Sequence, residues 1–323
     1  MEIRLAKTAG FCFGVDRAVK LTYGLLDEGR KVATLGPLIH NPQTVEDLER
    51  RGALVADTPA DVPAGYEVVI RSHGVPRSIY DELDARGCTY HDATCPFVKK
   101  IQKVASEAEA AGATLVVAGD VSHPEVQGIL GYCRGQALVF SSAEEMQELL
   151  AFLPSDGNIP VILAAQTTFS LREWEKILFF AKKVCTNLKV FDTICRATIE
   201  RQSEAKQLAQ SADAIVVVGG LHSANTTALA ALCGSYCPTV QVETADQLER
   251  HREALRGARF IGITAGASTP ACIIKEVQNS MSVLENNTEE MNFGELLDQY
   301  SKSIHNGEKV TAVVTGIKPT EIS

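Results

Sequence analysis

Tyr90-His91-Asp92-Ala93-Thr94-Cys95 and Val190-Phe191-Asp192-Thr193-Ile194-Cys195 are two strand-like stretches that each end in a cysteine. A polar residue follows each cysteine after 28 residues, and an earlier cysteine has the same spacing: Cys12 to His40, Cys95 to His123 and Cys195 to Ser223. An interval that occurs three times indicates an internal repeat. We therefore expect three copies of one structural unit.

Within each copy, short apolar runs alternate with segments of helical spacing. The β-branched runs have strand length and lie at 31–36, 67–71, 113–119, 160–165, 214–219 and 259–264. The segments between them show the periodicity of amphipathic helices, as at 96–112, 171–184 and 197–211. This alternation predicts an α/β fold with parallel sheets.

The three copies are predicted to close into a ring. The third copy lacks a final strand, which the N-terminal residues can supply. We assign the first unit to 13–95, the second to 96–192 and the third to 193–284, completed by strand 1–12. Ligands of parallel α/β sheets bind at the carboxyl ends of strands. A trefoil of three pseudo-threefold-related units would therefore point three cysteines and six polar loops at one centre.

Charge and hydropathy exclude several classes of protein. The 323 residues include 31 basic and 40 acidic side chains, for a formal net charge of −9. This balance excludes a basic field over the whole protein for binding nucleic acid. No apolar run approaches the ~18–20 residues of a membrane helix, and the N-terminal residues lack a signal-peptide pattern. We expect a cytoplasmic protein that does not contact a membrane.

Spacing separates three of the nine cysteines from the others. An odd number without an export signal argues against disulfides. Cys12, Cys95 and Cys195 each precede a helix start, where the helix dipole favours a thiolate. The rest have no partner in the repeat and are predicted to be structural: Cys88, Cys133, Cys185, Cys233, Cys237 and Cys272.

Three converging thiolates restrict the choice of metal. Structural zinc has four ligands at short spacings, whereas these cysteines are 83 and 100 residues apart. An iron–sulfur cluster that only carries electrons also takes four sulfur ligands. Three ligands would leave one iron with an open position, where substrate chemistry can occur. The spacing therefore favours an iron–sulfur enzyme.

The polar loops predict a phosphate-binding centre. They hold hydrogen-bonding side chains at strand ends and helix starts: His40, His73, His123, Thr167, Ser223, Asn225 and Ser268. Such positions bind phosphate through side chains and backbone N–H groups. No Walker loop or G-x-G-x-x-G sequence is present, so nucleotide binding is disfavoured. Glu125, the one carboxylate of these loops, could deliver a proton or simply occupy a helix N-terminus.

Together these residues resemble the 4-hydroxy-3-methylbut-2-enyl diphosphate reductases, the IspH (LytB) family of the non-mevalonate isoprenoid pathway. The resemblance covers residues 1–282. It rests on G-F-C-F-G-V-D-R-A at 10–18, I-H-N-P at 39–42, R-S-H-G-V at 71–75, D-A-T-C-P at 92–96, H-P-E-V at 123–126, A-Q-T-T at 165–168, T-I-C-R-A-T at 193–198, H-S-A-N-T at 222–226 and G-A-S-T-P at 266–270.

The resemblance implies an iron–sulfur-dependent oxidoreductase. A 4Fe–4S cluster would be held by Cys12, Cys95 and Cys195, with one open iron. The reaction would remove the C4 hydroxyl of an allylic diphosphate reductively, giving isopentenyl and dimethylallyl diphosphates in the last step of the pathway. Reduced ferredoxin or flavodoxin would supply the electrons.

The resemblance also implies roles for the polar residues. Glu125 would supply the proton through a network with Thr167, and His123 would orient the hydroxyl and the diphosphate. The diphosphate would be bound by His40, His73, Ser223, Asn225 and Ser268. The family usually has a second serine where this chain has Ala224.

The C-terminal tail predicts a different module. Residues 285–308 are polar and indicate a linker, and 309–317 are strand-like. This strand resembles the first strand of OB-fold RNA-binding modules that some family members carry. We expect 285–323 to be a linker and a truncated OB-fold start, with the natural protein continuing past Ser323 and any nucleic-acid contact made only through that module.

Two other functions remain open on the sequence. An iron–sulfur hydro-lyase also needs an open iron, but its turnover consumes no reductant. A non-catalytic iron–sulfur sensor would not change its cluster signals when an allylic diphosphate is added.

Overall fold

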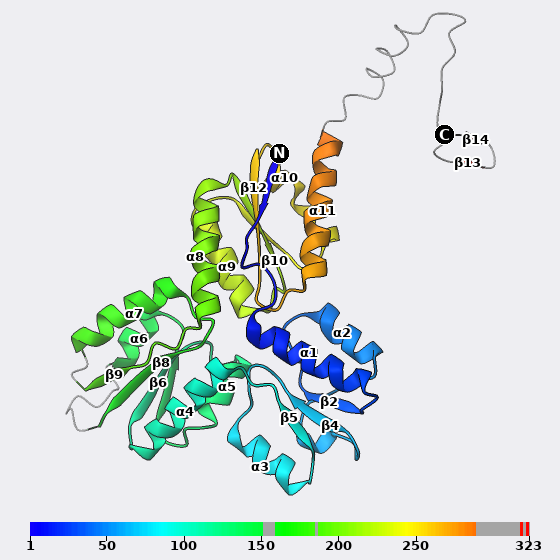
Figure 1. The fold of residues 1–323 in the computed structure, drawn as a ribbon. Helices are drawn as coiled ribbons and strands as arrows, with labels where there is room; N and C mark the ends of the chain where they lie inside the picture. Colours follow the sequence, from blue (N-terminus) through cyan, green and yellow to red (C-terminus); the bar gives the residue numbers. More distant parts are fainter. Residues whose placement is uncertain (151–158, 185–186, 289–316, 319–320, 323) are drawn as a thin grey trace, which may run out of the picture. The chain divides into compact units, whose positions relative to one another are not determined.

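The computed structural model describes residues 1–150, 159–184, 187–288, 317–318 and 321–322. Residues Met1–Ser280 form one compact unit, and Met281–Ser323 form a second. The first unit contains three four-stranded sheets. Figure 1 shows the first in blue and cyan, the second in green, and the third with the blue N-terminal strand beside later, yellow strands. Cys185 and most of the predicted tail lie outside the described residues.

The three sheets are parallel and share one strand order. The orders are β3-β2-β4-β5, β7-β6-β8-β9 and β11-β10-β12-β1. The first two sheets comprise β2 (Val32–Leu35), β3 (Leu54–Ala56), β4 (Glu67–Ile70), β5 (Tyr90–Asp92), β6 (Thr114–Ala118), β7 (Ala137–Phe140), β8 (Val161–Ala165) and β9 (Leu188–Val190). The third comprises β10 (Ala214–Val218), β11 (Thr239–Val242), β12 (Phe260–Ala265) and β1 (Glu2–Leu5).

The N-terminal strand completes the third sheet. β1 runs parallel to β12 with Glu2 opposite Phe260, in the place that β5 and β9 occupy in the other sheets. The predicted α/β trefoil of three similar units is therefore confirmed. The residue boundaries that we assigned to the units stay predictions.

One strand of each sheet was not predicted. β3, β7 and β11 have only three or four residues, and each forms an edge of its sheet. Their burial is mixed, because an edge strand has a neighbour on one side only. Such short segments carry too few alternating positions for hydrophobic periodicity to reveal them.

Helices connect the strands. In the first two thirds of the chain they are α1 (Phe13–Asp27), α2 (Pro42–Arg50), η1 (Pro59–Asp61), α3 (Arg77–Ala85), α4 (Pro96–Ala110), α5 (Pro124–Leu130), α6 (Ala143–Leu150), α7 (Leu171–Val184) and α8 (Arg196–Ser211). The remainder are α9 (Ala224–Gly234), η2 (Ala245–His251), α10 (Arg252–Leu255) and α11 (Ala271–Thr288). The helices expected at 96–112, 171–184 and 197–211 are thus confirmed as α4, α7 and α8. Among the described residues, no helix is long and apolar enough to cross a membrane.

Each sheet has a fully buried central strand, which in the first sheet is β2. β6, β8 and β10 are buried along their whole length, as expected for parallel strands with helices on both faces. Burial of these strands stabilises the sheets. The loops at the carboxyl ends of the strands therefore need not contribute apolar side chains and can contain polar ones.

The second unit contains a short antiparallel pair, β13 (Ile317–Lys318) and β14 (Glu321–Ile322). Helix α11 continues through residues 285–288, so the first four residues of the predicted linker are helical instead. The rest of that linker and all but Ile317 of the predicted 309–317 strand lie outside the described residues. The resemblance to an OB-fold module, and with it any nucleic-acid contact, stays a prediction.

Candidate active site

One cavity in the first unit is lined by residues that follow strands of all three sheets. Its empty volume is about 710 Å³, including solvent at its mouth. All eleven residues predicted for the site line it: Cys12, His40, His73, Cys95, His123, Glu125, Thr167, Cys195, Ser223, Asn225 and Ser268. The repeat therefore brings together side chains that are up to 256 residues apart in the sequence.

The three cysteines occupy equivalent places at helix starts. Each is the N-cap residue of its helix, with an extended backbone that turns the chain into α1, α4 or α8. Cys195 Sγ also lies 3.0 Å from Thr198 Oγ1. Burial raises the pKa of the Cys95 and Cys195 thiols, and the Cys12 thiol raises both further. Three thiolates therefore need a positive partner in this cavity.

Gly14 allows α1 to approach Cys95 closely. A Cβ atom at Gly14 would lie 2.8 Å from Cys95 Sγ and 3.1 Å from Cys95 Cβ. The first distance is shorter than real Cβ contacts and the second is tight, so a side chain at position 14 would displace the Cys95 sulfur. Gly14, two residues after Cys12, is thus part of the thiol site.

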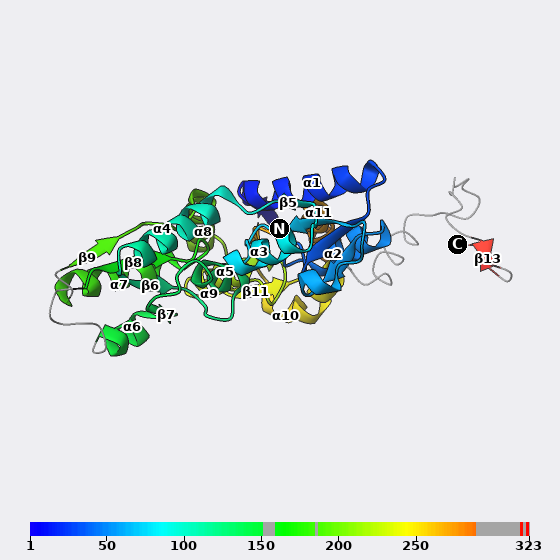
Figure 2. The ribbon, with the colours of Figure 1, turned by 90° about the horizontal axis from the view of Figure 1, so that it is seen from below.

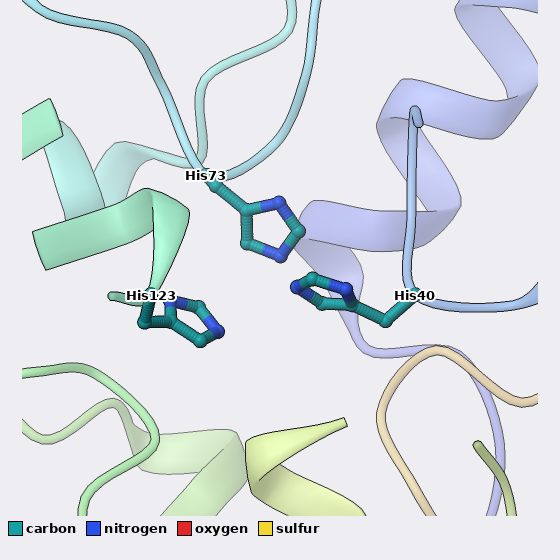
Figure 3. A group of neighbouring side chains, drawn as sticks. All are labelled: His40, His73 and His123. Atoms are coloured by element: carbon teal, nitrogen blue, oxygen red, sulfur yellow. The ribbon is translucent and has the colours of Figure 1, made fainter. Parts of the chain in front are cut away.

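Three histidine rings face one another on a second wall (Figure 3). The ring centroids are 4.6 Å apart for His40 and His73, 5.3 Å for His40 and His123, and 5.5 Å for His73 and His123. Burial lowers the pKa of all three, to about 4 for His123. The rings are therefore neutral at pH 7 when the cavity holds no anion.

The hydrogen bonds of these rings favour an anion over a metal ion. Their ligand atoms lie within 4.8 Å of one another, which is close enough for a shared cation. However, His123 Nδ1 accepts the backbone N–H of Glu125 at 3.1 Å, so the proton of the neutral ring is on Nε2. His123 thus presents a donor. Buried His40 Nε2 and His73 Nδ1 have no partner among the described residues, and the guanidinium of Arg71 lowers the pKa of all three rings.

Glu125 is a buried carboxyl with two short hydrogen bonds. Its side chain is 2% exposed. It accepts the Thr167 backbone N–H at 2.6 Å and the Thr167 hydroxyl at 2.7 Å. Burial raises the pKa of Glu125 to about 7, although both bonds to Thr167 act in the opposite direction. A carboxyl with this pKa can release and recover a proton near neutral pH.

The third sheet contributes small neutral donors. Ser223 caps α9, and Asn225 lies in its first turn with a buried Nδ2 that has no partner among the described residues. Ser268 donates to the backbone oxygen of His40 at 3.2 Å, which links the first and third sheets. Ala224 also lines the cavity.

Arg201 is a cavity residue that the sequence analysis missed. Its guanidinium donates to the backbone oxygens of Ala265 and Gly10 at 2.6 and 2.9 Å, and its buried Nε has no partner among the described residues. Burial lowers the pKa of Arg201, whereas the charges of Cys12 and Cys195 raise it. The equivalent residues after the other two cysteines are Ala18 and Ile101, both fully buried. Comparing the sixth residue after each cysteine could have revealed this charge.

Fold and cavity define a class of protein: a trefoil of parallel α/β units closed around a site of three helix-capping thiols. The chain matches the family model described as LytB protein over residues 3–282 and belongs to this family. Members of the family are iron–sulfur dependent.

Named relatives cover nearly the whole chain. The chain is 40% identical to 4-hydroxy-3-methylbut-2-enyl diphosphate reductase of Caldanaerobacter subterraneus, over 90% of this chain and 99% of the relative. It is 40% identical to that of Clostridioides difficile, over 88% and 100%. The solved (E)-4-hydroxy-3-methyl-but-2-enyl diphosphate reductase, terminal enzyme of the non-mevalonate pathway, is 38% identical with a TM-score of 0.62, covering 87% of this chain and 99% of that one. The Plasmodium falciparum reductase, at 24% identity and a TM-score of 0.80 over 86% and 87%, shares the fold.

Gly14→Ala tests the close approach of α1 to Cys95. The new methyl group would displace the Cys95 sulfur, so the variant should lose most of the iron that the wild-type protein holds. Gly24→Ala is the matched control, because a Cβ at this position of the same helix meets no atom within 4 Å. Iron content after anaerobic purification is the measurement, and equal iron in both variants would contradict the prediction.

Glu125→Gln tests the raised pKa of Glu125. Between about pH 4.3, the ordinary glutamate pKa, and pH 7, the folded protein holds a proton that the unfolded chain releases. Wild-type stability should therefore fall as pH rises through this window. Glutamine does not titrate, so its free energy of unfolding should lack this decrease. Relative to the wild type, the free energy of unfolding of the variant should therefore rise by about 3 kcal/mol between pH 4 and pH 8. Urea unfolding of the cluster-free proteins measures the difference, which a constant value across pH would refute.

Proposed function

We propose that the protein catalyses reductive dehydroxylation of 4-hydroxy-3-methylbut-2-enyl diphosphate. The substrate takes up two electrons and two protons, its allylic C–O bond breaks, and isopentenyl or dimethylallyl diphosphate and water are formed. The observation that carries the proposal is the convergence of three thiols, a carboxyl of pKa about 7 and a group of neutral donors in one cavity. The thiols would hold a cluster that supplies electrons, the carboxyl would supply a proton, and the neutral donors would bind the diphosphate.

The thiols suit a 4Fe–4S cluster with three protein ligands. Cys12, Cys95 and Cys195 would hold it, and no fourth cysteine among the described residues lines the cavity. Arg201 adds a buried positive charge beside the thiols, as a negatively charged cluster would need. When bound, the cluster would supply electrons and a Lewis-acidic iron for the allylic hydroxyl.

The polar wall suits the diphosphate. His40, His73 and His123 would donate hydrogen bonds, and Arg71 would add positive charge behind them. Ser223, Asn225 and Ser268 would bind from the third sheet. The N-termini of α5 and α9 also favour an anion at this end of the cavity. Holding the diphosphate away from the reacting carbon positions the substrate and excludes water.

Glu125 would provide the proton for the departing hydroxyl. Its carboxyl is within hydrogen-bonding distance of the Thr167 hydroxyl, which faces the same cavity. The proton would pass from Glu125 through Thr167, while His123 orients the hydroxyl and the diphosphate. After turnover, a pKa of about 7 allows Glu125 to take up another proton from water near neutral pH.

The two electrons come from outside the chain. A reductase of this kind requires a redox partner, and we assign that role to reduced ferredoxin or flavodoxin in the cytoplasm.

Anaerobic turnover tests the proposal. The reconstituted protein receives chemically reduced methyl viologen, and dye oxidation is followed after addition of 4-hydroxy-3-methylbut-2-enyl diphosphate. We expect substrate-dependent oxidation of two dye molecules per product. Glu125→Gln should keep its iron and lose most of this rate.

Either of two results would contradict the proposal. A full cluster with substrate consumed and no dye oxidised indicates a hydro-lyase. A full cluster with no substrate consumed and no change in the cluster spectrum indicates a sensor. Near-normal turnover of Glu125→Gln would remove Glu125 from the proton path.

A further inference from the structure

Large apolar side chains are exposed beside all three cysteines. Phe13 is 65% exposed, Phe97 42% and Ile199 37%, and each lies within four residues of Cys12, Cys95 or Cys195. Single exposed apolar residues are ordinary on protein surfaces. Here, however, the same kind of residue is exposed at the start of each of three repeated helices.

These helix starts belong to one face of the first unit. Gly14 of α1 touches Cys95 at the start of α4, and Gly14, Phe97 and Ala197 line the same cavity. Figure 2 shows α1, α4 and α8 toward the same edge of the view, away from α6 and α10. We call the surface formed by the starts of α1, α4 and α8, which includes the exposed Phe13, Phe97 and Ile199, the cysteine-helix face.

The cysteine-helix face is basic on an acidic protein. Besides the buried Arg201, the first eight residues of the three helices contain six basic and two acidic side chains: Arg17, Lys20, Lys99, Lys100, Lys103 and Arg196 against Asp16 and Glu200. The whole chain has a net charge of −9. Four of the six basic side chains pair with acids: Lys20 with Asp16, Arg196 with Glu200, Lys99 with Asp92 and Lys103 with Glu107. Lys100 makes no ion pair with another described residue, so the excess positive charge of this face comes from Arg17 and Lys100.

The wall between this face and the thiols is one residue thick. Phe97 is both exposed and part of the cavity lining, two residues after Cys95. Because electron transfer slows steeply with distance, a donor that rests on this wall is well placed to reduce a group held by the thiols. A small apolar centre with a charged surround is suited to brief, electrostatically steered contact with another protein.

We propose that the cysteine-helix face is the docking site for an acidic, one-electron carrier protein. This inference rests on the proposed function, since it names the donor surface for that reaction. Two carriers dock in turn, and each is oxidised by one electron. The two electrons and two protons break the C–O bond, release the hydroxyl as water and leave a C–H bond in the product.

The test compares a protein donor with a small-molecule donor on the reconstituted enzyme. The protein donor is a reduced plant-type ferredoxin and the small donor is reduced methyl viologen. The variants are Phe13→Ser and the double variant Lys100→Glu/Lys103→Glu. The matched controls are Phe179→Ser on α7, where the ring is 58% exposed, and Lys275→Glu on the exposed side of α11.

We expect the KM for ferredoxin to rise about tenfold in the face variants, with the lysine variant also losing most of its dependence on salt. Turnover with methyl viologen, the KM for the diphosphate and the iron content should stay at wild-type values, and the controls should match the wild type throughout. Because Phe13 adjoins Cys12, the lysine variant decides the outcome if Phe13→Ser loses iron.

Equilibrium binding of oxidised ferredoxin separates failure of this proposal from failure of the proposed function. If ferredoxin binds and the lysine variant weakens that binding, the docking site is supported even where the diphosphate is not reduced. If the face variants bind and accept electrons from ferredoxin as the wild type does, the docking site is refuted even where methyl viologen drives full turnover.

Discussion

Bringing three half-buried thiols to one point is the constraint on which the rest of the structure depends. Burial raises the pKa of the Cys95 and Cys195 thiols, and the charge of Cys12 raises both further. The positions at helix N-termini and the buried charge of Arg201, where the other repeats have Ala18 and Ile101, offset this cost. The absence of a side chain at Gly14 leaves room for the Cys95 sulfur. Each feature makes sense if the cavity holds a group that binds sulfur and carries negative charge, as an iron–sulfur cluster does.

A symmetric scaffold supports an asymmetric site. The first sheet contributes His40 and His73, the second His123, Glu125 and Thr167, and the third the small donors Ser223, Asn225 and Ser268. The cysteine is kept in all three repeats because the thiol site needs three equivalent ligands. The loops differ because one end of the proposed substrate is an anion and the other a reacting carbon, so an exact threefold copy could not bind both.

Much of this was predictable from spacing. The 28-residue interval predicted the trefoil, and the position of the polar loops after each strand predicted which residues would meet. The short edge strands β3, β7 and β11 were not predictable, because they depend on pairing with β2, β6 and β10 rather than on their own pattern. Nor could spacing supply the two bonds between Thr167 and Glu125, which are 42 residues apart and on different strand–helix connections. The proton on His123 Nε2 follows only from the observed backbone bond.

Iron and acid-labile sulfide content test the central claim most directly. The anaerobically purified wild-type protein should hold about four irons and about four sulfides per chain. Cys12→Ser, Cys95→Ser and Cys195→Ser should each lose most of both. Cys88→Ser should lose neither, because Cys88 does not line the cavity. Full iron and sulfide in any one of the first three variants would contradict the account.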